Sequence, residues 1–84
     1  MYFVYLLRCE DNSLYCGQTN NIDKRIREHN TSKHKSAKYT KGRRPVTLVY
    51  SEQMNTLSRA LKRECEIKKL SKIKKELLIQ RWKK

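Results

Sequence analysis

The alternation of apolar and polar positions divides the chain into three expected strands and three expected helices. Residues 2–8 are aromatic, β-branched or aliphatic on both faces until Arg8, which is typical of a central strand. A polar turn separates them from a second expected strand at residues 14–18, so these two segments are expected to form a hairpin. A third strand is expected at residues 46–50.

Helix start and stop signals place the three helices. The first is expected to begin at a cap among residues 19–21 and to reach about His29, with Asn30 as its stop. The second begins at Asn55 or Thr56, and Ser71 caps the third. The side chains expected to face inward are Ile22 and Ile26 in the first helix, Leu57, Ala60, Leu61 and Ile67 in the second, and Ile73, Leu77 and Leu78 in the third.

The order ββαβαα predicts an α+β domain in which a small three-stranded sheet is flanked by helices. A chain of 84 residues is expected to form one domain over residues 1–84, with one modest core. Residues 31–44 contain no aliphatic side chain larger than Ala37 and show no helical or strand period, so a basic loop is expected there.

Charge points to a polyanionic partner. The chain carries 21 Lys and Arg against 8 Asp and Glu, a net charge of +13, which favours nucleic acid ahead of an anionic membrane. Residues 1–30 are neutral, whereas residues 31–45 hold six basic side chains and no acidic one. These six are expected to contact phosphates: Lys33, Lys35, Lys38, Lys41, Arg43 and Arg44.

Other features argue against secretion and against a membrane-embedded protein. No apolar run approaches the roughly 18 residues of a membrane span, and no secretory leader precedes the first strand. Cys9, Cys16 and Cys65 leave one cysteine over from any pairing, so a disulfide scaffold is disfavoured and a cytoplasmic location fits. They are expected to be small buried side chains, since metal-site spacing with His34 is absent.

Two pairs of polar residues are candidates for chemistry. A hairpin places Tyr5 and Tyr15 on the same sheet face, beside Gly17, which permits close approach; the alternative is that both are ordinary sheet aromatics. Arg25 and His29 are four residues apart and share a helix face, where they suit phosphate binding and proton transfer. The alternative for this second pair is two solvated charges.

Glu64 stands within the apolar stripe of the second helix. Acids seldom occupy such a position unless they are paired or bound to a cation. An ion pair with Arg25 or with a lysine is one explanation. The other is a hard-metal ligand, because one carboxylate with phosphate oxygens and water is sufficient for Mg²⁺.

These residues together resemble a known family of nucleases. The pattern is Phe3, Val4 and Tyr5, then Tyr15, Cys16 and Gly17, then Arg25, His29 and Glu64. In order, spacing and expected secondary structure it resembles the GIY-YIG nucleases over about residues 2–78, especially the small stand-alone bacterial members.

The resemblance implies a GIY-YIG-like fold and a metal-dependent endonuclease that hydrolyses phosphodiester bonds in DNA, with branched or damaged repair intermediates as candidate substrates. It implies a single divalent cation, Mg²⁺ or Mn²⁺, bound by Glu64. Tyr5 and Tyr15 are implied to orient or deprotonate the attacking water, Arg25 to contact the scissile phosphate, and His29 to assist proton transfer.

Some positions depart from the family pattern. Phe3 stands in place of glycine, Cys16 in place of isoleucine, and Gln18 where some branches place a lysine. The alternative function is therefore a nucleic-acid-binding module on the same fold that does not cut; a basic ribosome-associated protein is supported by charge alone. Because so small a protein has little surface for recognising a long site, a protein partner that directs it to its substrate is also considered.

Overall fold

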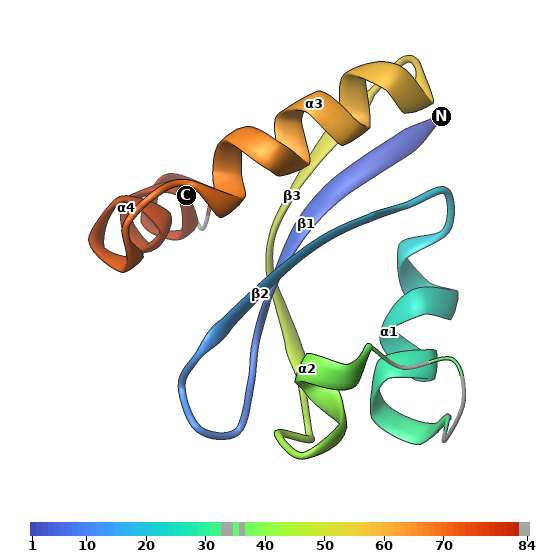
Figure 1. Cartoon of the computed structure of the whole chain (residues 1–84), viewed down its shortest axis with the longest axis vertical. Helices are drawn as coiled ribbons and strands as arrows, with labels where there is room; N and C mark the ends of the chain where they lie inside the picture. Colours follow the sequence, from blue (N-terminus) through green and yellow to red (C-terminus); the bar gives the residue numbers. More distant parts are fainter. Residues whose placement is uncertain (33–34, 36, 83–84) are drawn as a thin grey trace.

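A three-stranded antiparallel sheet forms the centre of the protein (Figure 1). The strands are β1 (Tyr2–Arg8), β2 (Leu14–Thr19) and β3 (Thr47–Met54), in the spatial order β2-β1-β3. The computed structural model describes residues 1–32, 35 and 37–82. The central position of β1 agrees with its apolar sequence on both faces, and the α+β class and the order of the six expected elements are confirmed.

β3 is longer than its composition predicts. It continues past Tyr50 through three polar residues to Met54, because these pair with the first half of β1 and bring Met54 opposite Tyr2. Leu6 pairs with Tyr50 and Leu7 with Leu48, so Val49 of β3 has no opposite residue in β1 and a bulge interrupts this ladder. Backbone pairing with a neighbouring strand, which composition does not report, therefore sets the end of β3.

Helix α1 (Ile22–Thr31) and the short helix α2 (Lys38–Lys41) lie on one side of the sheet (Figure 1). The side chain of Asn21 caps α1 by accepting a hydrogen bond from the backbone N–H of Lys24 at 3.1 Å. α2 occupies part of the segment expected to be an irregular loop. A four-residue helix is too short to show a hydrophobic period, so no sequence pattern indicated it.

Asn30 does not stop α1, contrary to the prediction. Its side-chain amide instead pairs with the backbone of Val46, donating to the carbonyl at 3.2 Å and accepting from the N–H at 2.7 Å. This pairing ties the end of α1 to the start of β3, so the helix continues to Thr31.

Helices α3 (Leu57–Lys68) and α4 (Lys72–Trp82) cover the other face of the sheet (Figure 1). Thr56 caps α3, as predicted, by accepting a hydrogen bond from the backbone N–H of Arg59. At the start of α4, the Ser71 hydroxyl accepts a hydrogen bond from the backbone N–H of Lys74. Among the described residues, no helix combines the length and apolar character needed to cross a membrane.

The protein has two small cores, where one was expected. Alternating side chains of β1 supply both, because successive residues of a strand point to opposite faces. Val4 and Leu6 pack beneath α3 and α4, whereas Tyr5 and Leu7 pack on the side of α1. All four side chains are almost completely buried, which explains the two-sided apolar sequence of this strand.

Several residues expected to face inward lie at the surface. Ile73 and Leu77 of α4 are 74% and 51% exposed, and Leu57 and Leu61 of α3 are also exposed; the buried side chain of α4 is Ile79. The expected orientation of α4 is therefore wrong for Ile73 and Leu77, whereas Leu78 packs against the core as expected.

An ion pair between the sheet and α4 accompanies this orientation. Glu76 accepts two hydrogen bonds from the guanidinium of Arg8, at 2.6 and 2.8 Å, and Lys72 donates to the carbonyl of Asn12 at 2.9 Å. These polar contacts hold one side of α4 against the end of the hairpin, which leaves Ile73 and Leu77 on the outside.

Candidate active site

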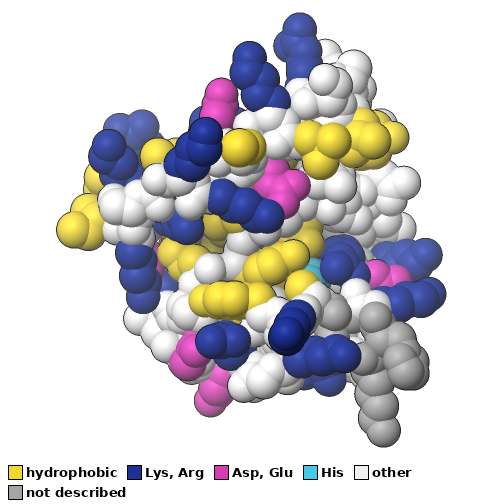
Figure 2. All heavy atoms as spheres, viewed as in Figure 1, with side chains coloured by type: hydrophobic (Ala, Val, Ile, Leu, Met, Phe, Trp, Pro, Cys, Tyr) yellow, Lys and Arg dark blue, Asp and Glu magenta, His cyan; other side chains and the backbone are white. Residues whose placement is uncertain are grey.

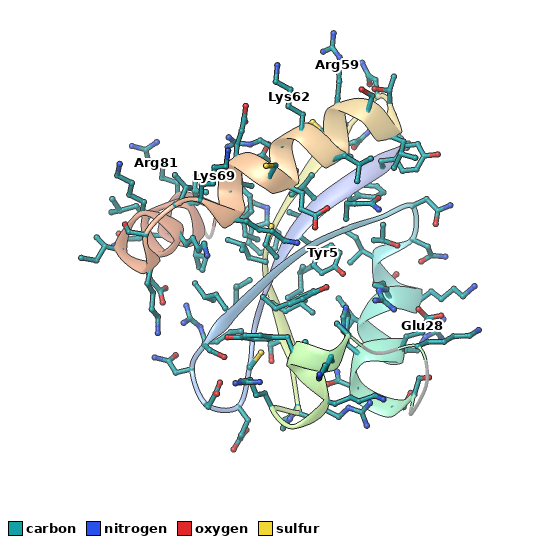
Figure 3. The ribbon with its side chains drawn as sticks, viewed as in Figure 1. Tyr5, Glu28, Arg59, Lys62, Lys69 and Arg81 are labelled. Carbon is teal, nitrogen blue, oxygen red and sulfur yellow. The ribbon has the colours of Figure 1, made fainter. Side chains whose placement is uncertain are left out.

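Tyr5 lies on the sheet face that carries α1 and α2 (Figure 3), and Tyr15 packs against the same small core. Tyr5 is opposite Gly17 and Tyr15 is opposite Leu7, so the two tyrosines are diagonal neighbours on one face, as predicted. Their ring centroids are 6.4 Å apart. A Cβ atom on Gly17 would lie 2.5 Å from the Tyr5 hydroxyl oxygen, so glycine at this position makes room for the Tyr5 side chain.

His29 reaches this face from α1 and is completely buried. Its Nε2 atom is 3.1 Å from the hydroxyl oxygen of Tyr5, and its ring centroid is 5.2 Å from that of Tyr15. Burial, followed by the charge of Arg25, lowers the pKa of His29 to about 4. The interpretation of His29 as a solvated cation is therefore wrong, because the imidazole is buried and neutral at physiological pH.

Thr40 of α2 was not singled out from the sequence, yet it completes the surroundings of His29. Its hydroxyl oxygen is 2.9 Å from Nδ1 of His29 and donates to the carbonyl of Ala37 at 3.0 Å. Thr40 is as completely buried as His29. It lies within the basic segment that shows no periodicity, so the local pattern held no signal of its burial.

Arg25 lies one helical turn before His29, partly exposed, with 26% of its side chain accessible. It donates to the carboxylate of Glu28 at 3.1 Å and to the backbone carbonyl of Lys35. Burial raises the pKa of Tyr5 above its ordinary value, whereas the neighbouring guanidinium of Arg25 acts in the opposite direction. The hydroxyl of Tyr5 is therefore protonated in the free protein and lies beside a fixed positive charge.

Glu64 approaches the same region from α3, and only 16% of its side chain is exposed. Its carboxylate is 2.8 Å from the ammonium of Lys68, so it is paired with a lysine, which was one of the two explanations considered for this acid. Burial is the main cause of the raised pKa of both Tyr5 and Cys16; the charge of Glu64 adds to it at Cys16 and, as the smallest contribution, at Tyr5. The charge of Glu64 is thus felt most clearly at Cys16 of β2.

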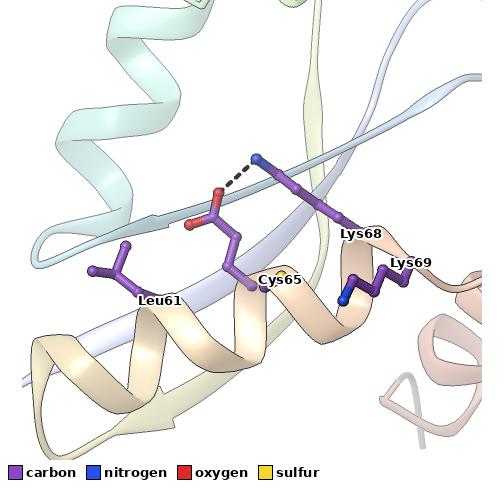
Figure 4. A pocket seen from close by; sticks show the side chains of 5 residues that line it. Leu61, Cys65, Lys68 and Lys69 are labelled. Atoms are coloured by element: carbon purple, nitrogen blue, oxygen red, sulfur yellow. Dashed lines mark ion pairs between the residues drawn. The ribbon is translucent and has the colours of Figure 1, made fainter.

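An open pocket of about 420 Å³ lies along this side of α3, with Leu61 and Glu64 on one end and Lys68 and Lys69 on the other (Figure 4). Cys65 also lines it and is exposed, whereas Cys9 and Cys16 are buried. The expectation that all three cysteines are buried is therefore wrong for Cys65. Among the described residues, no group of three His, Cys, Asp or Glu side chains could hold a metal ion.

The basic segment is divided between structural and exposed cations. Arg43 pairs with Asp11 at 3.0 Å and lies 4.3 Å from the ring centroid of Tyr39, and Arg44 donates to the backbone carbonyl of His29 at 2.7 Å. Both arginines thus hold the segment against the rest of the protein. The side chains of Lys35, Lys38 and Lys41 are exposed, and Lys33 lies outside the described residues.

The buried imidazole gives an expected pH dependence of stability. The folded protein leaves His29 neutral down to about pH 4, whereas the unfolded chain protonates it near 6.5, so stability falls as pH falls between these values. From pH 7.5 to pH 5 we expect His29 to account for a loss of about 2 kcal/mol in the free energy of unfolding. Arg25 and Arg44 oppose its protonation and Glu28 favours it.

Urea unfolding at the two pH values measures this loss, and the His29→Gln variant provides the control. The variant should lose clearly less stability than the wild type over the same interval, because glutamine does not titrate. An equal loss in the two proteins would show that His29 is already accessible to protons when folded.

The chain is similar to known proteins over most of its length. A family model described as the GIY-YIG catalytic domain matches residues 1–77. A UPF0213 protein from Syntrophus aciditrophicus is 54% identical over 78 residues, covering 93% of this chain and 88% of the relative. The UPF0213 protein YazA from Bacillus subtilis is 47% identical over 79 residues, covering 94% of this chain and 78% of the relative.

A solved structure has the same overall arrangement. The solution NMR structure of a UPF0213 protein from Bacillus halodurans aligns with a TM-score of 0.59 and 42% sequence identity. The alignment covers 95% of this chain and 84% of that one. The two proteins are therefore similar in both fold and sequence over nearly the whole length of this chain.

Proposed function

The chain belongs to the GIY-YIG catalytic domain family, and from this membership we propose that it is a divalent-metal-dependent endonuclease that hydrolyses phosphodiester bonds in DNA. The observation that carries the proposal is the buried contact of 3.1 Å between the Tyr5 hydroxyl and Nε2 of His29, beside the charge of Arg25. A sheet aromatic with a merely solvated hydroxyl has no need of a buried neutral imidazole.

The contact supplies a path for the proton of the attacking water. Tyr5 accepts this proton on its oxygen while passing its own proton to Nε2 of His29, so no free phenolate has to form. Because burial keeps the pKa of His29 near 4, the imidazole does not retain the proton for long. The ring centroid of Tyr15 is 5.2 Å from that of His29, so Tyr15 packs beside the Tyr5–His29 pair, where its hydroxyl orients the attacking water.

Arg25 contributes the charge that phosphodiester cleavage requires. Negative charge develops on the phosphate oxygens in the transition state, and a guanidinium can donate to two of them at once. Glu28 and the carbonyl of Lys35 hold the Arg25 side chain in place, which reduces the entropy lost when it engages a phosphate.

Glu64 is the residue that would hold the divalent ion. Its donor chemistry fits, because a single carboxylate with phosphate oxygens and water satisfies Mg²⁺ or Mn²⁺. When bound, such an ion neutralises charge on the scissile phosphate. Lys68 neutralises Glu64 in the free protein and would have to give up its ion pair to the metal.

The size of the protein favours recognition of DNA shape over a long sequence. A sequence-specific protein–DNA interface buries about 1,000–2,500 Å² of protein. The whole surface of this chain is 5712 Å², so such an interface would occupy roughly a fifth to two fifths of it. Branched, nicked or damaged DNA is the substrate class that so small a surface can select.

Cations on α2 supply part of the electrostatic contact with the DNA phosphates. Lys38 and Lys41 are exposed, flank Thr40 in the chain, and have no acidic partner among the described residues. Figure 2 shows how widely Lys and Arg side chains cover this view of the protein. Replacing both lysines by alanine should flatten the plot of log K against log salt by about 2, because each phosphate contact contributes roughly 0.9.

The matched control is a second pair of cations, on the outward side of α3. Arg59 and Lys62 project outward from α3 (Figure 3), so the Arg59→Ala/Lys62→Ala variant should keep the wild-type salt slope. Binding titrations of one labelled duplex at several salt concentrations give both slopes. If the salt slope flattens only in the Arg59→Ala/Lys62→Ala variant, the DNA-binding surface lies on the side of α3 and α4 instead.

Cleavage of a substrate panel tests the proposed function. Single-stranded, duplex, nicked and branched DNA and a matched RNA are incubated with Mg²⁺, Mn²⁺ or EDTA, and binding to the same oligonucleotides is measured in parallel. We expect metal-dependent cleavage of DNA, strongest on branched or nicked forms. Tight binding without cleavage under every metal would instead establish the chain as a binding module.

A further inference from the structure

Thr40 makes a contact that the family assignment does not explain. It is completely buried, and it comes from a four-residue helix whose other side chains are largely exposed. Its hydroxyl oxygen lies 2.9 Å from Nδ1 of His29, on the opposite side of the ring from Tyr5. The two nitrogens of the buried imidazole therefore have one partner each.

The hydrogen-bond chain has a single consistent direction. The carbonyl of Ala37 can only accept, so the Thr40 hydroxyl must donate to it at 3.0 Å. That hydroxyl has no second proton, so it accepts from Nδ1–H of His29. With its proton on Nδ1, the neutral ring carries a lone pair on Nε2, which accepts from the Tyr5 hydroxyl.

The reverse direction leaves a repulsive contact. If Nε2 carried the proton, Thr40 would donate to Nδ1, and its oxygen would then face the Ala37 carbonyl oxygen at 3.0 Å with no hydrogen between them. The Ala37 carbonyl keeps its two backbone donors, the N–H groups of Thr40 and Lys41, in either tautomer. The Nδ1–H tautomer thus gains one net hydrogen bond, which favours it by roughly five-fold.

We propose that Thr40 is a positioning residue that holds His29 as its Nδ1–H tautomer and so keeps the Nε2 lone pair directed at the Tyr5 hydroxyl. The catalytic consequence rests on the proposed nuclease function, whereas the tautomer does not. In this arrangement Tyr5 can lose its proton to His29; in the other tautomer Nε2–H would donate to Tyr5 and close that path.

The basic segment thereby acquires a second role. Arg43 and Arg44 hold it in place through Asp11 and the His29 carbonyl, while Thr40 reaches from it into the core. The segment proposed to contact phosphates is thus also the segment that determines which nitrogen of His29 carries the proton.

Nitrogen NMR of the uniformly labelled protein at pH 7 measures the tautomer directly, because protonated and bare imidazole nitrogens resonate far apart. The chain has two histidines, so the His34→Gln variant assigns the signals of His29. We expect the proton on Nδ1 in the wild type, in Thr40→Ser, which keeps the hydroxyl, and in Tyr5→Phe, which keeps Thr40. Thr40→Val, which has nearly the same shape but no hydroxyl, should move the proton to Nε2.

Single-turnover cleavage by the same proteins gives the second readout. Thr40→Val should be slower by about 10–100-fold, as is typical when the partner that orients a functional histidine is lost, and Thr40→Ser should recover most of the rate. A merely structural role of Thr40 would alter thermal stability without moving the imidazole proton.

Three results would overturn the proposal. These are a wild-type proton on Nε2, an Nδ1 proton retained in Thr40→Val, or a proton that moves in Tyr5→Phe. The wild-type and Tyr5→Phe spectra decide the matter even if Thr40→Val does not fold. Absence of cleavage by the wild type would refute the nuclease function and leave the tautomer to be judged by NMR alone.

Discussion

Replacing Tyr5 by phenylalanine should lower the single-turnover cleavage rate by about 10²–10⁴-fold while leaving DNA binding almost unchanged. The substitution keeps the ring that fills the space above Gly17 and removes only the hydroxyl that faces Nε2 of His29. The substitution leaves the buried Nε2 of His29 without its donor, which should cost about 1–3 kcal/mol, less than the stability of a typical folded domain. Cleavage and equilibrium binding are measured on one oligonucleotide.

Tyr50→Phe is the matched control. Tyr50 is also buried in the sheet and donates its hydroxyl proton to Glu52, but it belongs to the core beneath α3 and α4. Its loss should change stability and leave the cleavage rate near that of the wild type. If Tyr5→Phe cuts at the wild-type rate, the proton path through His29 is not the route of the reaction.

The second large effect is expected at Glu64. Glu64→Gln should abolish the metal-dependent cleavage, because an amide is a much weaker ligand than a carboxylate for a hard divalent ion. The fold should persist, since the ion pair that is lost, with the half-exposed Lys68, contributes about 0–1 kcal/mol. Cleavage rates over a titration of Mg²⁺ and Mn²⁺, beside a thermal unfolding curve, measure the effect.

A neighbouring glutamate serves as the control for this substitution. Glu66 lies on the same helix, is exposed, and pairs with Arg63 at 3.2 Å, so Glu66→Gln changes the net charge equally without touching the site. It should cut like the wild type. Undiminished cleavage by a folded Glu64→Gln protein would reduce Glu64 to the partner of Lys68.

The strands and the first helix were predictable because their signals are local. A strand buried on both faces must be apolar at consecutive positions, which marked β1 as central, and Asn21 is one of the residues whose side chain can cap a helix. α4 was misjudged because apolar residues surround much of it, so no single stripe defines its buried side. The ion pair of Glu76 with Arg8, 68 residues away, accompanies the observed orientation.

In the candidate site, too, some relations between residues follow from local sequence and others only from tertiary packing. The alternation of side chains in a hairpin is enough to place Tyr5 and Tyr15 on one face, and the helical repeat is enough to align Arg25 with His29. Both relations depend on backbone geometry within a few residues, which local sequence encodes. Tertiary structure alone decided that His29 is buried and that Thr40 holds its Nδ1 atom. Burial and the choice of a polar partner depend on which distant segments pack together, and no pattern along a single segment carries that information.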